Sequence, residues 1–236
     1  MFVNVYKYVR IILCNFIRVQ KKNMKKLKNK KATEKKSSSG MQFVFVGFGN
    51  PGEAYTNTRH NVGFLVLDHF RESFRFPHWV ENGKTTALLS KDTLGKHTVT
   101  LVLPQTFMNK SGSSVKKLVT NKKATERLVV VYDDLDLPLG NIKISFGRSS
   151  GGHKGVESII KSIGTKDFVR VRVGVSHATA AGKIKKPKGE RAVLDFILKE
   201  FRKPEQEQLK KIFKQTDRAL ELLATEGRAK AMNECN

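Results

Sequence analysis

The sequence predicts an α/β fold, in which a β-sheet is covered by helices. Short apolar runs rich in β-branched residues recur along the chain, as expected of buried strands, and segments with apolar residues at helical spacing lie between them. Strands that alternate with helices form a layered sheet. The chain of 236 residues suits one large domain, or at most two small ones, and can bury a sizeable core. Its two cysteines, Cys14 and Cys235, stand near opposite ends, which excludes a disulfide-stapled scaffold and a cysteine zinc module.

The first half of the expected domain opens with a buried strand at residues 43–46, which ends at Gly47. A turn-rich stretch follows, and apolar side chains at helical spacing then predict a helix at residues 62–70, with Pro77 closing the segment. Two further apolar runs predict strands, at residues 98–103 and 128–132.

The second half contains two strands with a clean alternation. In residues 142–146 and 169–173, apolar side chains alternate with polar ones, so each strand is expected to have one apolar and one polar face. Arg170 and Arg172 share the polar face of the second strand. Apolar periodicity also predicts two helices, at residues 156–163 and at residues 209–223, the latter stopped by Gly227.

Basic residues dominate both parts of the chain. The 45 Lys and Arg exceed the 21 Asp and Glu and give a formal net charge of +24. Residues 1–40 hold 12 basic residues and one acid, which leaves 33 basic and 20 acidic residues, or +13, for residues 41–236. A globular part with that surplus favours a polyanionic partner such as a nucleic acid, because basic side chains near phosphates release condensed counterions.

Residues 1–40 are expected to form a basic tail outside the folded domain of residues 41–236. Residues 2–17 are apolar but interrupted by polar side chains, and they are too short to span a membrane. Residues 21–36 are rich in lysine, a composition that forms no core. The tail is compatible with a mitochondrial presequence and equally with the basic tail of a cytosolic protein, so both compartments stay open.

The first expected strand is followed by the motif GFGNPG, residues 47–52. Its glycine spacing matches that of a dinucleotide site, but such a site needs a helix that begins within the motif. Pro51 and the delay of the helix until about His60 argue against this interpretation. Asn50 instead stands at the carboxyl end of a strand, where α/β sheets bind ligands.

A histidine and three acids are candidates for the chemistry. His60 lies just before the first predicted helix, and an imidazole is the natural general base near neutral pH. Asp133, Asp134 and Asp136 follow the third predicted strand. They offer ligands for a divalent cation, although their spacing is not that of an EF-hand. The competing interpretation is that Asp133 orients His60, as carboxylates do in catalytic triads.

Two loops complete the set of candidate motifs. The stretch PQTFMNKSG, residues 104–112, places Asn109 at the same edge of the sheet as Asn50 and Asp133. The glycine-rich loop GRSSGGHKG, residues 147–155, enters a helix and is either a phosphate-binding loop or a plain mobile loop. Its spacing is not that of a nucleoside-triphosphate site.

Together and in this order, these motifs resemble the bacterial-type peptidyl-tRNA hydrolase family over residues 42–233. The matching stretches are GFGNPG, TRHN, PQTFMNKSG, DDLDLPLG and GGHKG. The resemblance implies a single domain with a twisted mixed β-sheet flanked by helices, of the phosphorylase/hydrolase-like type. It also implies a monomer that uses no metal and no cofactor.

The family hydrolyses the ester that joins a peptide to the 3′-terminal ribose of tRNA, which recycles the tRNA for translation. The resemblance implies that His60 is the general base that activates water and that Asp133 holds its imidazole. It also implies that Asn50 and Asn109 position the ester and the peptide backbone. An ester has a good alkoxide leaving group, so such a site needs no covalent intermediate. The implied substrate-binding set is Asn50, Tyr55, Phe107, Asn109, His153 and Lys154.

The resemblance also implies a contact with the 5′ phosphate of the tRNA. Lys143 and Arg172 match the family's phosphate clamp. Ser145 stands where the family often has a second lysine, which implies a weaker clamp. The basic segment of residues 183–191 either compensates for this loss or is a solvated loop, since phosphate contacts tolerate varied geometry.

Lys154 departs from the family motif, which reads Gly-Gly-His-Asn-Gly. Its ammonium group donates hydrogen bonds but accepts none, and its charge is expected to lower the pKa of a nearby His60. Some members of this fold bind RNA without hydrolysing it, so a non-catalytic RNA-binding relative is the alternative function. The complete set of His60, Asp133, Asn50 and Asn109 favours the hydrolase.

Overall fold

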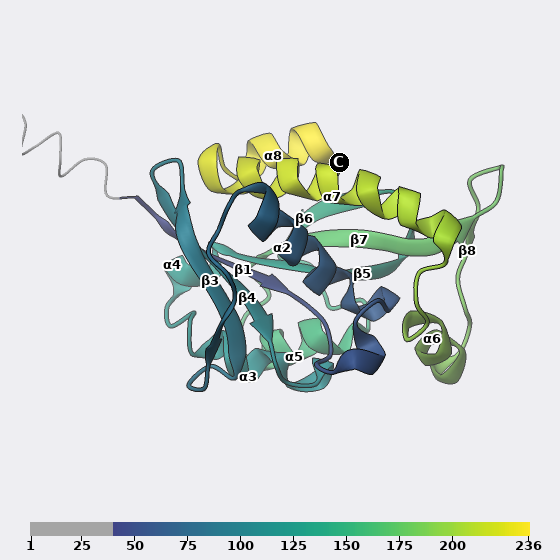
Figure 1. The fold of residues 1–236 in the computed structure, drawn as a ribbon, viewed down its shortest axis with the longest axis horizontal. Coiled ribbons are helices and arrows are strands. Elements are labelled where there is room, and N and C mark those ends of the chain that lie inside the picture. Colours follow the sequence, from purple (N-terminus) through teal and green to yellow (C-terminus); the bar gives the residue numbers. More distant parts are fainter. Residues whose placement is uncertain (1–39) are drawn as a thin grey trace, which may run out of the picture. The chain divides into compact units, whose positions relative to one another are not determined.

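The structure is a computed structural model, and it describes residues 40–236 (Figure 1). The expected basic tail, with its presequence hypothesis, lies outside the described residues except for Gly40. Within the described part of the chain, no helix is both long enough and apolar enough to cross a membrane.

A sheet of eight strands forms the centre of the described domain. The strands are β1 (Gln42–Gly47), β2 (Val80–Asn82), β3 (Ala87–Leu94), β4 (His97–Pro104), β5 (Leu128–Pro138), β6 (Ile142–Phe146), β7 (Val169–Ala178) and β8 (Ile184–Lys185). Their order is β2-β3-β4-β1-β5-β7-β6, and β8 pairs with β7 beside this path. The central strands β4, β1, β5 and β7 are parallel, whereas the outer strands are antiparallel to their neighbours. The predicted mixed sheet is therefore confirmed.

Helices cover both faces of this sheet (Figure 1). They are α2 (Val62–Ser73), α3 (Ser111–Lys116), α4 (Lys122–Thr125), α5 (Lys154–Ile163), α6 (Glu190–Ile197), α7 (Lys203–Thr225) and α8 (Arg228–Cys235). Helices α2, α7 and α8 bury apolar side chains against one face, which includes Phe45 and Val131. Helices α3 and α5 do the same on the other face, which includes Val46 and Val130. Successive residues of the central strands thus supply two separate cores.

The predicted elements are present, with two corrections. The strand expected to end at Tyr132 continues to Pro138, so the three acids lie inside β5 rather than after it. The polar faces of β6 and β7 are partly buried, since Ser145 and Arg170 are buried whereas Lys143 is exposed and Arg172 is half-buried. Ser145 and Arg170 line the wall of a cavity.

A close approach between α2 and the sheet fixes the start of this helix. A Cβ atom on Gly63 would lie 2.3 Å from the Phe48 nitrogen and 2.4 Å from the Val131 carbonyl oxygen, so only glycine fits here. The Phe64 N–H donates to the Phe48 carbonyl at 3.1 Å, and the Phe48 N–H donates to the Val131 carbonyl at 3.0 Å. The turn that precedes α2 is thereby held at the carboxyl end of β1 and beside β5, and the carboxyl ends of strands are where ligands bind in such sheets.

The outer edge of β6 is covered by a side chain. The amide oxygen of Asn236, which follows α8, accepts from the Ile144 N–H at 2.6 Å. The Nδ2 of the same amide donates to the Ile144 carbonyl at 3.1 Å. The amide therefore satisfies both backbone groups of Ile144, as a residue of a neighbouring strand would.

Candidate active site

His60 belongs to a short 3₁₀ turn, Arg59–Asn61, that leads into α2. The side-chain amide of Asn61 accepts from the Asn50 N–H at 2.9 Å and donates to the Asn50 carbonyl at 2.9 Å. The side-chain oxygen of Asn50 accepts from the Met108 N–H, also at 2.9 Å. These bonds fix three loops at the carboxyl ends of the sheet relative to one another, and His60 lies in one of them.

One carboxylate oxygen holds two histidine rings. His60 Nδ1 lies 2.9 Å from Asp133 Oδ1, and His153 Nε2 lies 3.0 Å from the same atom. The Gly155 N–H donates to His153 Nδ1 at 3.2 Å, so the proton of this ring is on Nε2 and points at the carboxylate. The Asp133 carboxylate accepts and does not donate, so His60 also donates to it, through Nδ1, and the neutral ring has a lone pair on Nε2. That nitrogen is free to take a proton from a water molecule.

The charge of Asp133 controls the protonation of the site. Burial lowers the pKa of His60, but the carboxylate charge and the hydrogen bond to it outweigh burial and raise this pKa overall. Burial raises the pKa of Asp133, but the two histidines together outweigh it and hold this pKa far below its ordinary range. Asp133 is therefore ionised near neutral pH and stabilises a positively charged His60.

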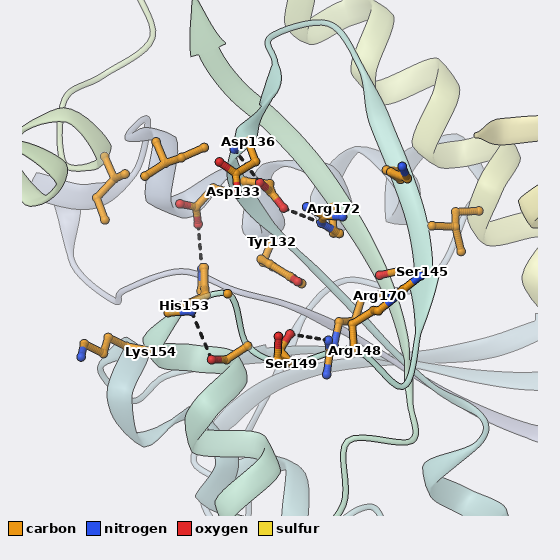
Figure 2. Close-up of a pocket in the computed structure, with 18 of the residues that line it drawn as sticks. Tyr132, Asp133, Asp136, Ser145, Arg148, Ser149, His153, Lys154, Arg170 and Arg172 are labelled. Atoms are coloured by element: carbon orange, nitrogen blue, oxygen red, sulfur yellow. Dashed lines mark hydrogen bonds and ion pairs between the residues drawn. The ribbon is translucent and has the colours of Figure 1, made fainter. Parts of the chain in front are cut away.

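The predicted site residues fall into two groups. The first group lines a cavity of about 1040 Å³ (Figure 2) and comprises His60, Asp133, Lys143, His153, Lys154 and Arg172. The second group lies outside the lining of this cavity and comprises Asn50, Tyr55, Phe107 and Asn109. Phe107 is 57% exposed, and it flanks Met108, to which Asn50 is bonded. The Asn61 amide joins the two groups, because it follows His60 in the chain and holds Asn50.

A basic wall runs along β6 and β7. Lys143 and Arg172 are register partners across these strands, so their side chains share one side of the cavity. The Nε of Arg172 donates to Asp134 Oδ2 at 2.5 Å. Lys186, from the predicted basic segment, pairs with Asp136. Two of the three acids that were candidates for a divalent cation are thus engaged by basic side chains.

His60, Asp133 and His153 offer metal-ligand atoms that lie within 4.8 Å of one another. In the tautomers assigned above, both ring nitrogens that face the carboxylate carry a proton. A metal ion at this point would have to displace both protons and break both hydrogen bonds. The donor set therefore fits a hydrogen-bonded triad better than a metal centre.

Lys154 is the exposed first residue of α5. Figure 2 shows its side chain directed away from His153 and Asp133. The expectation that its charge lowers the pKa of His60 is wrong, because burial and Asp133 set this pKa and their sum raises it. The lysine therefore leaves the histidine–carboxylate group intact.

Comparison with known proteins identifies the family. The sequence profile of the peptidyl-tRNA hydrolase family matches residues 44–236. The chain is a member of this family. It is 38% identical over 193 residues to the peptidyl-tRNA hydrolase of Thermodesulfovibrio yellowstonii, which covers 80% of this chain and 96% of that protein. It is 42% identical over 197 residues to the peptidyl-tRNA hydrolase of Herpetosiphon aurantiacus, which covers 82% and 90%.

A solved structure agrees with this assignment. The crystal structure of peptidyl-tRNA hydrolase from Acinetobacter baumannii superposes with a TM-score of 0.73 at 28% identity, covering 84% of this chain and 95% of that one. The fold is that of a peptidyl-tRNA hydrolase, and the protein is an enzyme of this family with peptidyl-tRNA as its substrate. The alternative function, a non-catalytic RNA-binding relative, is not favoured, since the similar proteins carry the name of the enzyme.

Two features of this peptidyl-tRNA hydrolase site were not predicted. Asn61 closes the TRHN motif, and its position directly after His60 was the available signal for its role. Arg170 was placed on a polar strand face, but its complete burial has no signal in the sequence. That burial depends on the glycine-rich loop, whose Ser149 carbonyl accepts from Arg170 Nη1 at 2.8 Å.

Proposed function

We propose that this enzyme hydrolyses peptidyl-tRNA with a water molecule that His60 activates. His60 Nε2 takes a proton from the water as its oxygen attacks the ester carbonyl, and Asp133 stabilises the imidazolium that forms. The proton then passes to the 3′ oxygen of the leaving ribose, which yields free peptide and free tRNA. The observation that carries the proposal is the 2.9 Å contact between His60 Nδ1 and Asp133 Oδ1.

Asn50 is suited to hold the ester carbonyl. The Met108 N–H donates to the Asn50 side-chain oxygen, which fixes the orientation of the amide, and the hydrogen bonds of Asn50 within residues 40–236 do not use its Nδ2. An N–H donor at this place stabilises the negative charge that develops on the carbonyl oxygen during attack. Asn109, two residues from Phe107, is exposed and offers a second amide to the peptide backbone.

Lys143 and Arg172 are suited to bind the 5′ phosphate of the tRNA. Asp134 orients the Arg172 guanidinium through Nε, and the two Nη groups have no protein partner within residues 40–236. A guanidinium held in this way presents two further N–H donors to phosphate oxygens. The same cavity is lined by His60, so the proposal places the phosphate contact and the hydrolysis in one continuous site.

The test is release of the labelled acyl group from N-acetyl-aminoacyl-tRNA by the purified protein. His60→Ala is expected to lower kcat by about 10²–10⁴-fold with little change in tRNA binding, since a general base contributes about that much to rate. His78→Ala is the matched control, because His78 is exposed and lies outside the cavity lining. A His60→Ala variant with the wild-type rate contradicts the proposal.

A further inference from the structure

Arg170 is a fully buried cation on β7 that is only partly satisfied. Its Nη1 donates to the Ser149 carbonyl at 2.8 Å, and its guanidinium lies over the Phe168 ring at 4.7 Å from the centroid. Its Nε and Nη2 are buried too and have no hydrogen-bond partner within residues 40–236. Burying a charge with unpaired donors costs free energy. A hydrogen-bond acceptor that binds Nε and Nη2 would therefore be stabilised at this place.

The two unpaired groups form one edge of the guanidinium. Nε–H and Nη2–H point in the same direction, and this edge binds two oxygens of a carboxylate or phosphate at once. The acids of the Asp-Asp-Leu-Asp motif in the same cavity already bind other groups, namely the two histidines, Arg172 and Lys186. No carboxylate within the described residues therefore pairs with Arg170.

Ser145 adds a further unpaired group at the same place. It is the register partner of Arg170 across β6 and β7, and its buried Oγ also lacks a partner within residues 40–236. Arg148 lines the same cavity. Figure 2 shows Arg170 with its hydrogen bond to Ser149, and Ser145 on the neighbouring strand. The hydroxyl and the guanidinium edge match the oxygens of a tetrahedral anion, and Arg148 adds a positive charge to the same cavity.

We propose that Arg170, Ser145 and Arg148 form a subsite for one phosphate group of the substrate RNA. The subsite rests on the proposed function and is separate from the Lys143 and Arg172 pair. A phosphate fits better than a carboxylate, because it presents more than two oxygens and its charge offsets a cluster of cations. The C-terminal carboxyl group of the peptide is esterified in the substrate, so the RNA is the natural source of the anion.

The glycine-rich loop of residues 147–152 controls access to this subsite. Arg170 holds the loop through the Ser149 carbonyl, and Arg148 is an exposed side chain of the same loop. Three glycines of the loop have φ values between +62° and +82°, a backbone conformation that other residues rarely adopt. A phosphate that enters from the cavity reaches the Arg170 edge when this loop shifts, and the loop leads directly to His153.

The first test uses inorganic phosphate as the probe. Its binding is measured by isothermal titration calorimetry at constant ionic strength, in a Lys143→Ala/Arg172→Ala background that removes both side chains of the other phosphate contact. Arg170→Lys keeps the charge but loses the bidentate edge and is expected to weaken binding about tenfold, and Ser145→Ala about threefold. Arg71→Lys is the matched control, because Arg71 is a buried arginine of α2 outside the cavity lining. Equal phosphate affinity in Arg170→Lys and in the control overturns the proposal.

Thermal unfolding shows whether each variant is folded. If Arg170→Lys does not fold, the test rests on Ser145→Ala, which removes one hydroxyl without a change of charge. A phosphate affinity of Ser145→Ala that equals that of its parent then overturns the proposal. The calorimetry contains no peptidyl-tRNA. A failure of the phosphate subsite is therefore distinguishable from a failure of the hydrolysis tested with His60→Ala.

The second test separates the two phosphates that the RNA can supply. KM is measured for Arg170→Lys with substrate that carries a 5′ phosphate and with substrate that carries a 5′ hydroxyl. A rise in KM of about tenfold with the first substrate alone assigns the terminal phosphate, and a rise with both assigns an internal phosphodiester. A KM that does not rise with either substrate overturns the proposal.

Discussion

Asp133 Oδ1 accepts hydrogen bonds from His60 and from His153, and this sharing fixes both rings in one tautomer each. His153 is in turn the N-cap of α5, where its Nδ1 accepts from the Gly155 N–H. His153, at the N-terminus of α5, therefore holds the Asp133 carboxylate, and the same carboxylate orients His60. His153 serves Asp133 in addition to its expected place in the substrate-binding set.

Replacing Asp133 by asparagine should shift the pH dependence of the reaction. The charge that raises the pKa of His60 is lost, so this pKa falls and the acidic limb of kcat/KM moves to lower pH. At the optimum, kcat should fall by about 10²-fold or more, because asparagine does not stabilise the imidazolium. Rates measured from about pH 5 to pH 8 with both proteins decide this point. An acidic limb that stays in place would show that another group sets the pKa.

Lys154→Asn should restore the family residue without moving the acidic limb. Lys154 is exposed and directed away from Asp133, so the pKa of His60 does not depend on its charge. We expect a change in kcat/KM of about tenfold or less, the size of one altered hydrogen bond. The pH profiles of wild type and variant should superimpose after scaling. A limb that moves upward in the variant would place the ammonium group near His60 after all.

The residues of the site could be listed from the sequence, but their contacts could not. His60 and Asp133 are 73 positions apart, and the sequence offered their pairing only as one of two interpretations of the acids, which the resemblance to a family then favoured. Hydrogen-bond partners across such a separation depend on the strand order, which alternation of apolar residues does not reveal. The same limit applies to Arg170, whose burial comes from a loop that folds over its strand.

At the level of elements, the continuation of β5 to Pro138 separates the roles of neighbouring acids. Successive side chains of a strand point to opposite faces. Asp133 therefore reaches the two histidines, while Asp134 is turned to Arg172 on the basic wall. If these residues lay in a loop, no strand geometry would direct Asp133 and Asp134 to different partners.

A second element contact ties the catalytic turn to the segment between α6 and α7. The Arg59 N–H donates to the Lys199 carbonyl at 3.1 Å. The Arg59 guanidinium donates to the Lys199 and Glu200 carbonyls at 3.0 and 2.9 Å. It also binds both carboxylate oxygens of Glu205 at 2.8 Å. Because both partners are buried, this ion pair anchors the residue next to His60.

Glu205→Gln should destabilise the protein. It leaves the buried Arg59 charge uncompensated, and we expect the free energy of unfolding to fall by about 3–5 kcal/mol. Urea denaturation near pH 7 measures this loss. Glu207→Gln, on the exposed side of the same helix, is the control and should change the free energy by less than about 0.5 kcal/mol.

The same pair makes part of the stability pH-dependent. Burial raises the pKa of Glu205, but the Arg202 backbone N–H and Arg59 outweigh it and lower this pKa below the ordinary 4.5. The stability contributed by the ionised carboxylate is therefore present above 4.5 and is lost as the pH falls through the lowered pKa. The gap between wild type and Glu205→Gln should shrink in acid, and a gap that is constant with pH would contradict the ionic origin of the effect.

The elements that sequence reasoning did not predict are those with weak patterns. Strand β3 has the polar sequence Ser-Lys-Asp-Thr at its centre, and its pairing with β4 makes it a strand. Helix α8 buries only Ala231, and α6 buries only Ile197. The central strands and α5 and α7 bury regular apolar faces, so their periodicity was visible.

For the whole molecule, the positive charge should act mainly on the encounter with tRNA. Lys143→Ala and Arg172→Ala are each expected to raise KM, to leave kcat nearly unchanged and to reduce the slope of log KM against log salt by about 1. KM measured across a salt series gives this slope. Substrate with a 5′ hydroxyl is the control, and an equal loss with that substrate would show that these residues do not bind the terminal phosphate.

The Asn236 amide at the edge of β6 has a consequence for how the molecule meets its own copies. An open sheet edge invites an extended segment of another chain to add as a further strand, which is the first step of many aggregation reactions. Here the outward backbone groups of Ile144, the middle residue of a five-residue strand, are already bonded by the amide. An incoming segment would have to break both of those bonds before it could pair along the edge of β6. One side chain thus opposes strand addition at the edge of the strand that carries Lys143 and Ser145.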